Sequence, residues 1–132
     1  MGETSHWAVL VRPEQPTLGS LVLICREAVK AFGAVSPAAF AELGPVVARI
    51  EAMLRGFTRY DKINYLMLMM QDPDVHFHVI PRYEGERSHD GLTVPDAAWP
   101  GPPVLGKAVK PDEAQLRGLA TALRARWADT PS

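Results

Sequence analysis

This chain of 132 residues has only one cysteine. It also has no long apolar run and no marked excess of charge of either sign. The one cysteine, Cys25, cannot form a disulfide within the chain, and it lies in an apolar run where it packs as a small hydrophobe. No run reaches the roughly 18 apolar residues of a membrane span. The start, Met1–His6, is too short and polar for a signal peptide. We therefore expect a cytoplasmic protein with no membrane partner.

Charge is nearly balanced, with 14 Lys and Arg residues against 15 Asp and Glu and a formal net charge of −1. Broad binding to a nucleic acid polymer needs a basic face, so we do not expect this class of partner. A single nucleotide needs only a few local donors and stays compatible with this composition. The length, with 47% apolar residues, predicts one domain over 1–132 with a real core.

The order of patterns along the chain predicts an α+β domain. Apolar runs at 7–11 and 18–24, joined by a Pro-rich turn, indicate an antiparallel hairpin. Ser36-Pro37 predicts the start of a long helix with Ser36 as N-cap. Its expected apolar stripe, at helical spacing, consists of Phe40, Leu43, Val47, Ile50, Leu54 and Phe57.

The second half predicts two more strands and a second helix. Residues 61–70 read as one long strand covered on both faces, with Met67, Met69 and Met70 in the core. This strand is expected to pair with the run that follows it. Beyond the expected core at 7–83, we predict that 84–132 is an irregular segment and a C-terminal helix starting near Pro111. The sum is a mostly antiparallel sheet of about five strands with helices on one side.

The run from Asp74 to Arg82 is the candidate site. It alternates polar and apolar residues with period two, which indicates a half-buried strand with Asp74, His76 and His78 on one face. Alternate side chains lie roughly 7 Å apart, so one ligand can reach both imidazoles. Pro81 is expected to end the ladder because it has no N–H. The alternative is an exposed polar face with two incidental histidines.

Two neighbouring imidazoles can perform phosphoryl chemistry. A neutral imidazole, with a pKa near 6.5, can attack phosphorus and form a covalent phosphoramidate. A second imidazole can donate a proton or bind a non-bridging oxygen, and such help is typically worth about 10²–10⁴ in rate. A metal site is the competing interpretation, in which His76 and His78 supply two ligands and residues such as Glu86 or His89 complete the set.

The residues from His76 to Arg82 resemble the end of the histidine-triad (HIT) motif, His-x-His-x-His followed by two apolar residues and often Pro-Arg. The runs at 7–24, 36–57 and 62–70 resemble the first hairpin, the long helix and the preceding strand of this family. Trp99–Pro103 resembles the tail of compact bacterial members of the dinucleoside polyphosphate hydrolase-like type.

This resemblance implies a HIT-like fold and a nucleotide hydrolase or nucleotidyl transferase. The reaction would occur at the α-phosphate of a nucleotide, such as a dinucleoside polyphosphate, with His76 as nucleophile and His78 in support. Asn64, Arg12 and Gln71 are the expected nucleotide- or phosphate-binding residues. The resemblance also implies a homodimer, and its histidine mechanism requires no metal or other cofactor.

Asp74 departs from the family pattern, because it stands at the first triad position in place of histidine. Its carboxylate could accept a hydrogen bond and hold an imidazole in place, which favours an enzyme. It would also repel a polyphosphate and favour a protonated, non-nucleophilic His76, which favours a catalytically weak or inactive nucleotide-binding protein. Arg12 departs as well, standing where members carry an early nucleotide-contacting asparagine, and Gln71 replaces the usual Gly-Gln only loosely.

Overall fold

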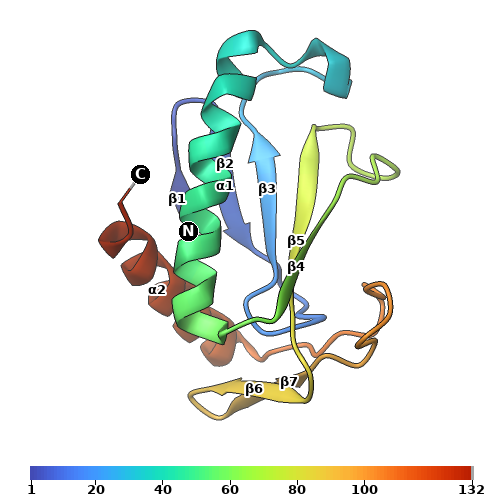
Figure 1. The fold of residues 1–132 in the computed structure, drawn as a ribbon, viewed down its shortest axis with the longest axis vertical. Coiled ribbons are helices and arrows are strands. Elements are labelled where there is room, and N and C mark those ends of the chain that lie inside the picture. Colours follow the sequence, from blue (N-terminus) through green and yellow to red (C-terminus); the bar gives the residue numbers. More distant parts are fainter. Residues whose placement is uncertain (132) are drawn as a thin grey trace.

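The computed structural model describes residues 1–131 and has one five-stranded antiparallel sheet with two helices on one side of it (Figure 1). The strand order in the sheet is β1-β2-β3-β5-β4. The strands of this sheet are β1 (Gly2–Glu3), β2 (Trp7–Val11), β3 (Leu21–Cys25), β4 (Lys62–Leu66) and β5 (His76–Arg82). The helices are η1 (Phe32–Ala34, a 3-10 turn), α1 (Pro37–Thr58) and α2 (Glu113–Asp129). The predicted α+β class is confirmed.

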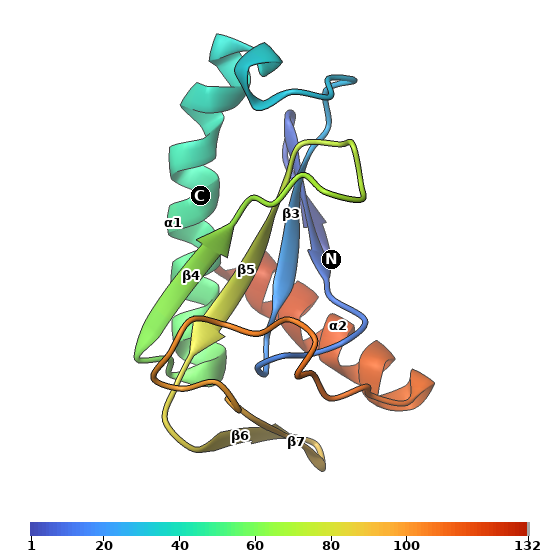
Figure 2. The same cartoon turned by 90° about the vertical axis from the view of Figure 1, so that its right-hand side faces the viewer.

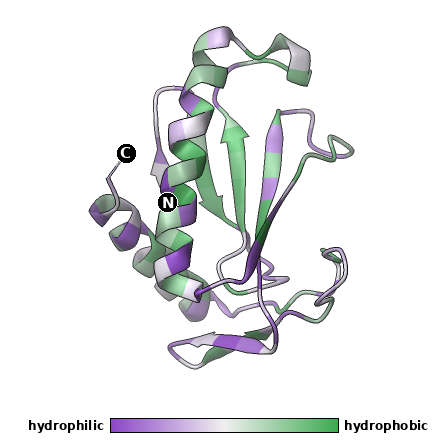
Figure 3. Cartoon of the chain, viewed as in Figure 1, coloured by the Kyte–Doolittle hydropathy of each residue, from purple (hydrophilic) through white to green (hydrophobic). Residues whose placement is uncertain are grey.

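The core lies between the sheet and α1. Strands β2 and β3 pair as the predicted hairpin, with Trp7 opposite Cys25 and Val11 opposite Leu21. Figure 3 shows both strands as almost wholly apolar, while α1 mixes polar and apolar residues. The face toward α1 carries the buried side chains, and Trp7 fixes the helix by donating its Nε1–H to the Ala39 carbonyl at 2.8 Å. The other face of the sheet is left for a site.

Helix α1 begins where the sequence predicted, because Ser36 Oγ accepts the Ala39 N–H at 3.1 Å. The predicted stripe needs correction at its start, since Phe40 is 40% exposed while Ala39 is fully buried. The prediction favoured the larger side chain, but the close approach of the Trp7 indole selects the small one. The buried positions of the helix are Ala39, Val46, Ile50, Met53, Leu54 and Thr58.

The long strand predicted over 61–70 is wrong beyond Leu66. Met69 has φ 53°, a left-handed conformation that breaks an extended chain, and residues 67–75 form a loop. Leu68 and Met70 are 49% and 84% exposed, so Met70 is not a core residue. Met67 and Met69 pack partly against the core, as expected. The loop therefore carries apolar side chains to the surface beside the histidine strand.

Pro81 does not end the ladder as predicted. Strand β5 continues through it to Arg82, with Pro81 opposite Ile63 on β4. Pairing of β5 with β3 stops at Val79, so Pro81 comes where β5 has one neighbouring strand instead of two. A residue without an N–H is tolerated at such a position.

The segment after Arg82 is more regular than predicted. Strands β6 (Glu86–His89) and β7 (Leu92–Pro95) form a separate antiparallel hairpin. Its turn is Asp90-Gly91, with φ 44° and 82°, a dipeptide that the sequence analysis overlooked as a hairpin signal. Residues 96–110 then pass across the end of the sheet where β4 begins and β5 ends (Figure 2).

Helix α2 closes the chain against α1. Asp112 is its N-cap and forms a capping box with Gln115, one residue after the predicted start at Pro111. Leu119, Leu123 and Trp127 are buried. Within residues 1–131, neither helix has the length and apolarity that crossing a membrane requires.

Candidate functional site

His76 and His78 lie on β5 and line a pocket of about 620 Å³. Their rings stand edge to face, with centroids 5.2 Å apart. The other polar walls are Arg12, Glu14, Gln71 and Asp72, and the apolar walls include Val22, Leu68, Met70 and Leu105. The pocket is thus assembled from the first hairpin, the 67–75 loop, β5 and the segment that precedes α2.

The imidazole of His76 is held in one orientation. It is 6% exposed, and its Nδ1 lies 2.7 Å from the backbone carbonyl oxygen of Asp74. A carbonyl only accepts, so this contact requires the proton on Nδ1. In a neutral ring the lone pair is then on Nε2. The arrangement provides an oriented, unprotonated nitrogen on a side chain that lines the pocket.

Asp74 contributes through its backbone and not through its carboxylate. Strand β5 begins at His76, so Asp74 precedes the strand, and its side chain is exposed. The expected carboxylate on the same strand face as the imidazoles is therefore absent from the described pocket walls. The Asp74 N–H donates to Asp72 Oδ1 at 2.9 Å, one peptide group before the carbonyl that meets His76.

His78 and Arg12 both present nitrogen atoms that lack a partner. His78 Nδ1 and Arg12 Nη1 are buried without a hydrogen bond in residues 1–131. Burial lowers the pKa of His78, and the positive charges of Arg12 and then His76 lower it further. Burial also lowers the pKa of Arg12, against the opposing effect of Glu14. Buried polar atoms of this kind are normally satisfied, and Nδ1 of a neutral His78 can act as donor or as acceptor.

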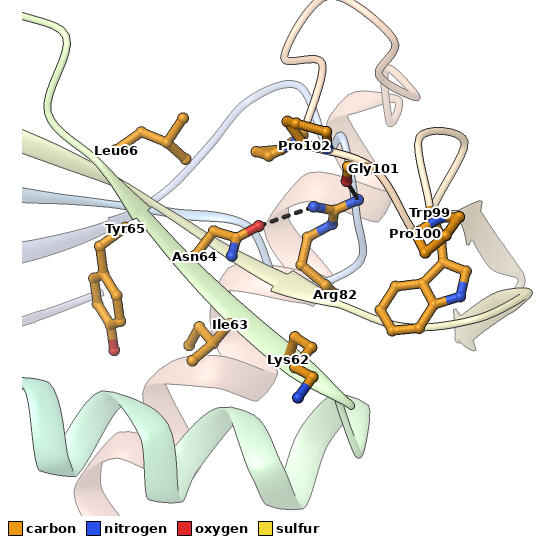
Figure 4. A pocket seen from close by; sticks show the side chains of 11 residues that line it. Lys62, Ile63, Asn64, Tyr65, Leu66, Arg82, Trp99, Pro100, Gly101 and Pro102 are labelled. Atoms are coloured by element: carbon orange, nitrogen blue, oxygen red, sulfur yellow. Dashed lines mark hydrogen bonds between the residues drawn. The ribbon is translucent and has the colours of Figure 1, made fainter.

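Asn64 is not part of the histidine pocket. It lies on β4 opposite Ile80, and its Oδ1 accepts from Arg82 Nη1 at 2.8 Å (Figure 4). Arg82 is 4% exposed and pairs with Asp96, with Nε–Oδ2 at 2.7 Å and Nη2–Oδ1 at 3.1 Å. Its Nη2 also donates to the Gly101 carbonyl at 2.9 Å. This buried group fixes the segment after β7 to the sheet.

A separate cavity of about 820 Å³ lies between β4 and Trp99–Pro103, and Asn64 lines it (Figure 4).

Of the residues predicted from the sequence, the structure brings Arg12, Gln71, His76 and His78 to one pocket. The sequence analysis missed Glu14, Asp72 and Leu105 as pocket walls. Asp72 could have been found from the sequence, because it lies two residues before Asp74, whose N–H donates to it. No local pattern pointed to Leu105.

No family model matches this chain, and a search of curated proteins finds no significant match. Solved structures do match. A histidine triad protein, blr8122, from Bradyrhizobium japonicum is 26% identical with a TM-score of 0.75 and covers 95% of this chain and 87% of its own. One from Sinorhizobium meliloti 1021 is also 26% identical with a TM-score of 0.75, and covers 95% and 86%.

A third histidine triad protein, from Marinobacter aquaeolei VT8, is 26% identical with a TM-score of 0.73 and covers 98% of this chain and 88% of its own. The match thus extends over nearly the whole chain in each case. The chain has the histidine-triad fold, as its sequence motif predicted.

Proposed function

We propose that this protein is a HIT-like nucleotide hydrolase or nucleotidyl transferase, acting at the α-phosphate of a nucleotide such as a dinucleoside polyphosphate. The observation that carries the proposal is the 2.7 Å contact between His76 Nδ1 and the Asp74 carbonyl oxygen, which leaves Nε2 as the nucleophilic atom. The likeness to histidine triad proteins supports the same reading.

In the first step the Nε2 lone pair of His76 forms a bond to phosphorus while the bond from phosphorus to the leaving oxygen breaks. The modified ring carries a positive charge, and the Asp74 carbonyl stabilises it through the Nδ1–H. His78, whose pKa is lowered, is neutral at pH 7 and donates a hydrogen bond to a non-bridging oxygen. Water or another hydroxyl then attacks phosphorus and releases its proton to solvent, the P–N bond breaks, and neutral His76 returns.

The test is product analysis and intact mass after mixing the protein with diadenosine tetraphosphate or adenosine phosphoramidate. We expect AMP release and a transient nucleotidyl adduct with the native chain, and neither with His76→Asn. His89→Asn is the matched control, because His89 lies on β6 outside the pocket walls. Turnover that survives His76→Asn would contradict the covalent mechanism.

A nucleotide-binding protein with weak or no catalysis is the second candidate. The carboxylates of Glu14 and Asp72 in the pocket walls favour it, because they repel a phosphate chain. Tight nucleotide binding without turnover on either substrate would select it. The metal-dependent alternative has no comparable support, since no three His, Cys, Asp or Glu side chains in residues 1–131 are placed to hold an ion.

A homodimer is also part of this proposal. Strand β4 is an edge of the sheet, and exposed edge strands are templates for pairing with another chain. Sedimentation equilibrium gives the mass in solution directly, and a monomer at all concentrations tested would contradict this part alone.

A further inference from the structure

We propose that the thioether of Met70 is a reversible oxidation site in the wall of the histidine pocket, and that its sulfoxide weakens the binding of the ligand in that pocket. The oxidant is a hydroperoxide. The site itself follows from the exposure and placement of Met70, whereas the identity of the ligand rests on the proposed function.

The methionines of this chain are concentrated beside the histidine pocket. The chain has five methionines, and Met67, Met69 and Met70 lie within four consecutive positions. These positions belong to the 67–75 loop, which joins β4 to β5 and projects on the side of β5 away from α1 (Figure 1). Met70 is one of the residues that line the pocket together with His76 and His78. A chemical change at Met70 is therefore a change in the pocket wall.

Exposure sets the order in which the sulfur atoms react. Met70 is 84% exposed, whereas Met53 is buried in the core and the single thiol, Cys25, is also buried. Met67 and Met69 are half-buried and pack against the core. A hydroperoxide reaches sulfur through solvent, and susceptibility to oxidation follows exposure. Met70 is therefore the first sulfur to be oxidised.

The reaction transfers one oxygen atom to the Met70 sulfur. A sulfur lone pair attacks the terminal oxygen of the hydroperoxide, so that the S–O bond forms while the O–O bond breaks. The proton of the terminal oxygen passes to the oxygen that leaves, which departs as water or an alcohol. The sulfur is oxidised to the sulfoxide and the hydroperoxide is reduced. A methionine sulfoxide reductase reverses the change, with a thiol as the reductant.

The sulfoxide changes the polarity of an apolar wall. Met70 forms this side of the pocket with Val22, Leu68 and Leu105. A thioether is only a weak acceptor, whereas a sulfoxide is polar and binds water. That water must be removed before a ligand contacts the wall, and removing it without a replacement hydrogen bond costs free energy. The ligand therefore binds less tightly to the oxidised protein.

The 67–75 loop is held in a way that allows it to respond. Within residues 1–131, no backbone hydrogen bond joins residues 67–74 to another backbone group. The bond from the Asp74 N–H to Asp72 Oδ1 stays inside the loop. Segments with few backbone hydrogen bonds open at a low cost in free energy. The loop can therefore rearrange around a hydrated sulfoxide while the sheet below it stays intact.

Treatment with tert-butyl hydroperoxide, followed by peptide mass mapping and calorimetric titration of AMP, tests the inference. We expect Met70 to gain oxygen first and Met53 last. The Kd of AMP should rise about threefold or more once Met70 is modified, relative to the untreated sample of the same protein. Incubation with a methionine sulfoxide reductase and a thiol should return the Kd to its starting value.

Three variants separate the effect of the Met70 sulfur from general oxidation. Met70→Leu keeps an apolar side chain without sulfur, so its Kd should not respond to the hydroperoxide. Met70→Gln is polar without oxidation and should bind AMP about threefold or more weakly than Met70→Leu. Met53→Leu is the matched control, because Met53 is buried in α1, and it should respond to the hydroperoxide as the native chain does.

Oxidation of Met53, Met67 or Met69 before Met70 would overturn the site. An unchanged Kd after Met70 alone has gained oxygen, or an equal response in Met70→Leu, would overturn its effect on the pocket. A chain that binds no AMP before treatment contradicts the proposed function and with it the effect on the ligand. The order of oxidation tests Met70 without any nucleotide, so the two failures are distinguishable.

Discussion

At the scale of single residues, a backbone atom orients the imidazole of His76. The carbonyl of Asp74, not its carboxylate, accepts from His76 Nδ1, and the Asp74 N–H donates to Asp72 Oδ1. The orientation of the His76 ring therefore depends on the path of the main chain at 72–74. The tautomer of His76 therefore does not depend on the carboxylate of Asp74.

Substitutions at Asp72 and Asp74 distinguish the effect of the Asp74 backbone carbonyl from the effect of the Asp74 carboxylate. We predict that Asp74→Asn changes kcat by less than about twofold, because the carbonyl is retained. Asp72→Ala removes one hydrogen bond of about 0.5–1.5 kcal/mol and should lower kcat by about twofold to tenfold. Steady-state kinetics with diadenosine tetraphosphate measure both. A larger loss for Asp74→Asn than for Asp72→Ala would show that the carboxylate acts directly.

The depressed pKa of His78 predicts a pH-dependent stability. The unfolded chain binds a proton at His78 near pH 6.5, whereas the folded chain does so only at lower pH. Below about pH 6.5 the unfolded state holds more protons, so the free energy of unfolding falls as pH decreases until the folded pKa is passed. Thermal melts from pH 8 to pH 5 should show a shallower decline in His78→Gln than in the native chain. His89→Gln, outside the pocket, is the control, and equal declines in all three would contradict the prediction.

At the scale of elements, one end of β5 lines the histidine pocket and the other end anchors a later segment of the chain. Its first residues carry the imidazoles, and its last residue, Arg82, fixes the segment after β7 through Asp96, Asn64 and the Gly101 carbonyl. In this chain, Arg82 of the Pro81-Arg82 pair therefore has a structural role. It positions the segment that later supplies Leu105 to the histidine pocket.

Removing one member of the buried Arg82–Asp96 pair should lower the free energy of unfolding more than removing both members. Arg82→Met leaves the Asp96 carboxylate buried without its cation, and we expect the free energy of unfolding to fall by about 3–5 kcal/mol. The double variant Arg82→Met/Asp96→Leu should recover part of that loss. Urea denaturation of the three proteins measures both values. A double variant no more stable than the single one would show that the contacts to Asn64 and Gly101 dominate.

At the scale of the whole molecule, the fold buries one face of the sheet and leaves the other for chemistry. Helix α1 covers the buried face, and the histidine pocket opens on the opposite face between the first hairpin and the 67–75 loop. The two faces give very different surroundings to two methionines, Met53 and Met70. Met53 of α1 is 2% exposed, whereas Met70 of the loop is 84% exposed.

This division predicts opposite outcomes for matched substitutions. Met53→Ala should lower the free energy of unfolding by about 2–5 kcal/mol, because it leaves a cavity in the core. Met70→Ala should change it by less than about 0.5 kcal/mol, since little of its surface is removed from water. Chemical denaturation gives both values. A large loss for Met70→Ala would show that the loop packs against something else, such as a second copy of the chain.

Local patterns were sufficient for much of the fold. Alternation identified β5, a short apolar run identified β2, and Ser36-Pro37 located the start of α1 within one residue. The motif around His76 and His78 led to the fold that the solved structures share. These features succeed because hydrophobic period, helix capping and side-chain alternation are properties of neighbouring residues.

Tertiary structure decided what depends on residues far apart in the sequence. The apolar run after Leu66 looks like a strand, but the left-handed Met69 ends it and exposes Met70. Asn64 was predicted to bind a nucleotide, and the structure places it outside the histidine pocket, where its amide oxygen accepts from Arg82. The sequence alone determined which side chains the site has available. Only packing, strand register and the backbone path determined which of them meet, because each contact joins segments that no local pattern relates.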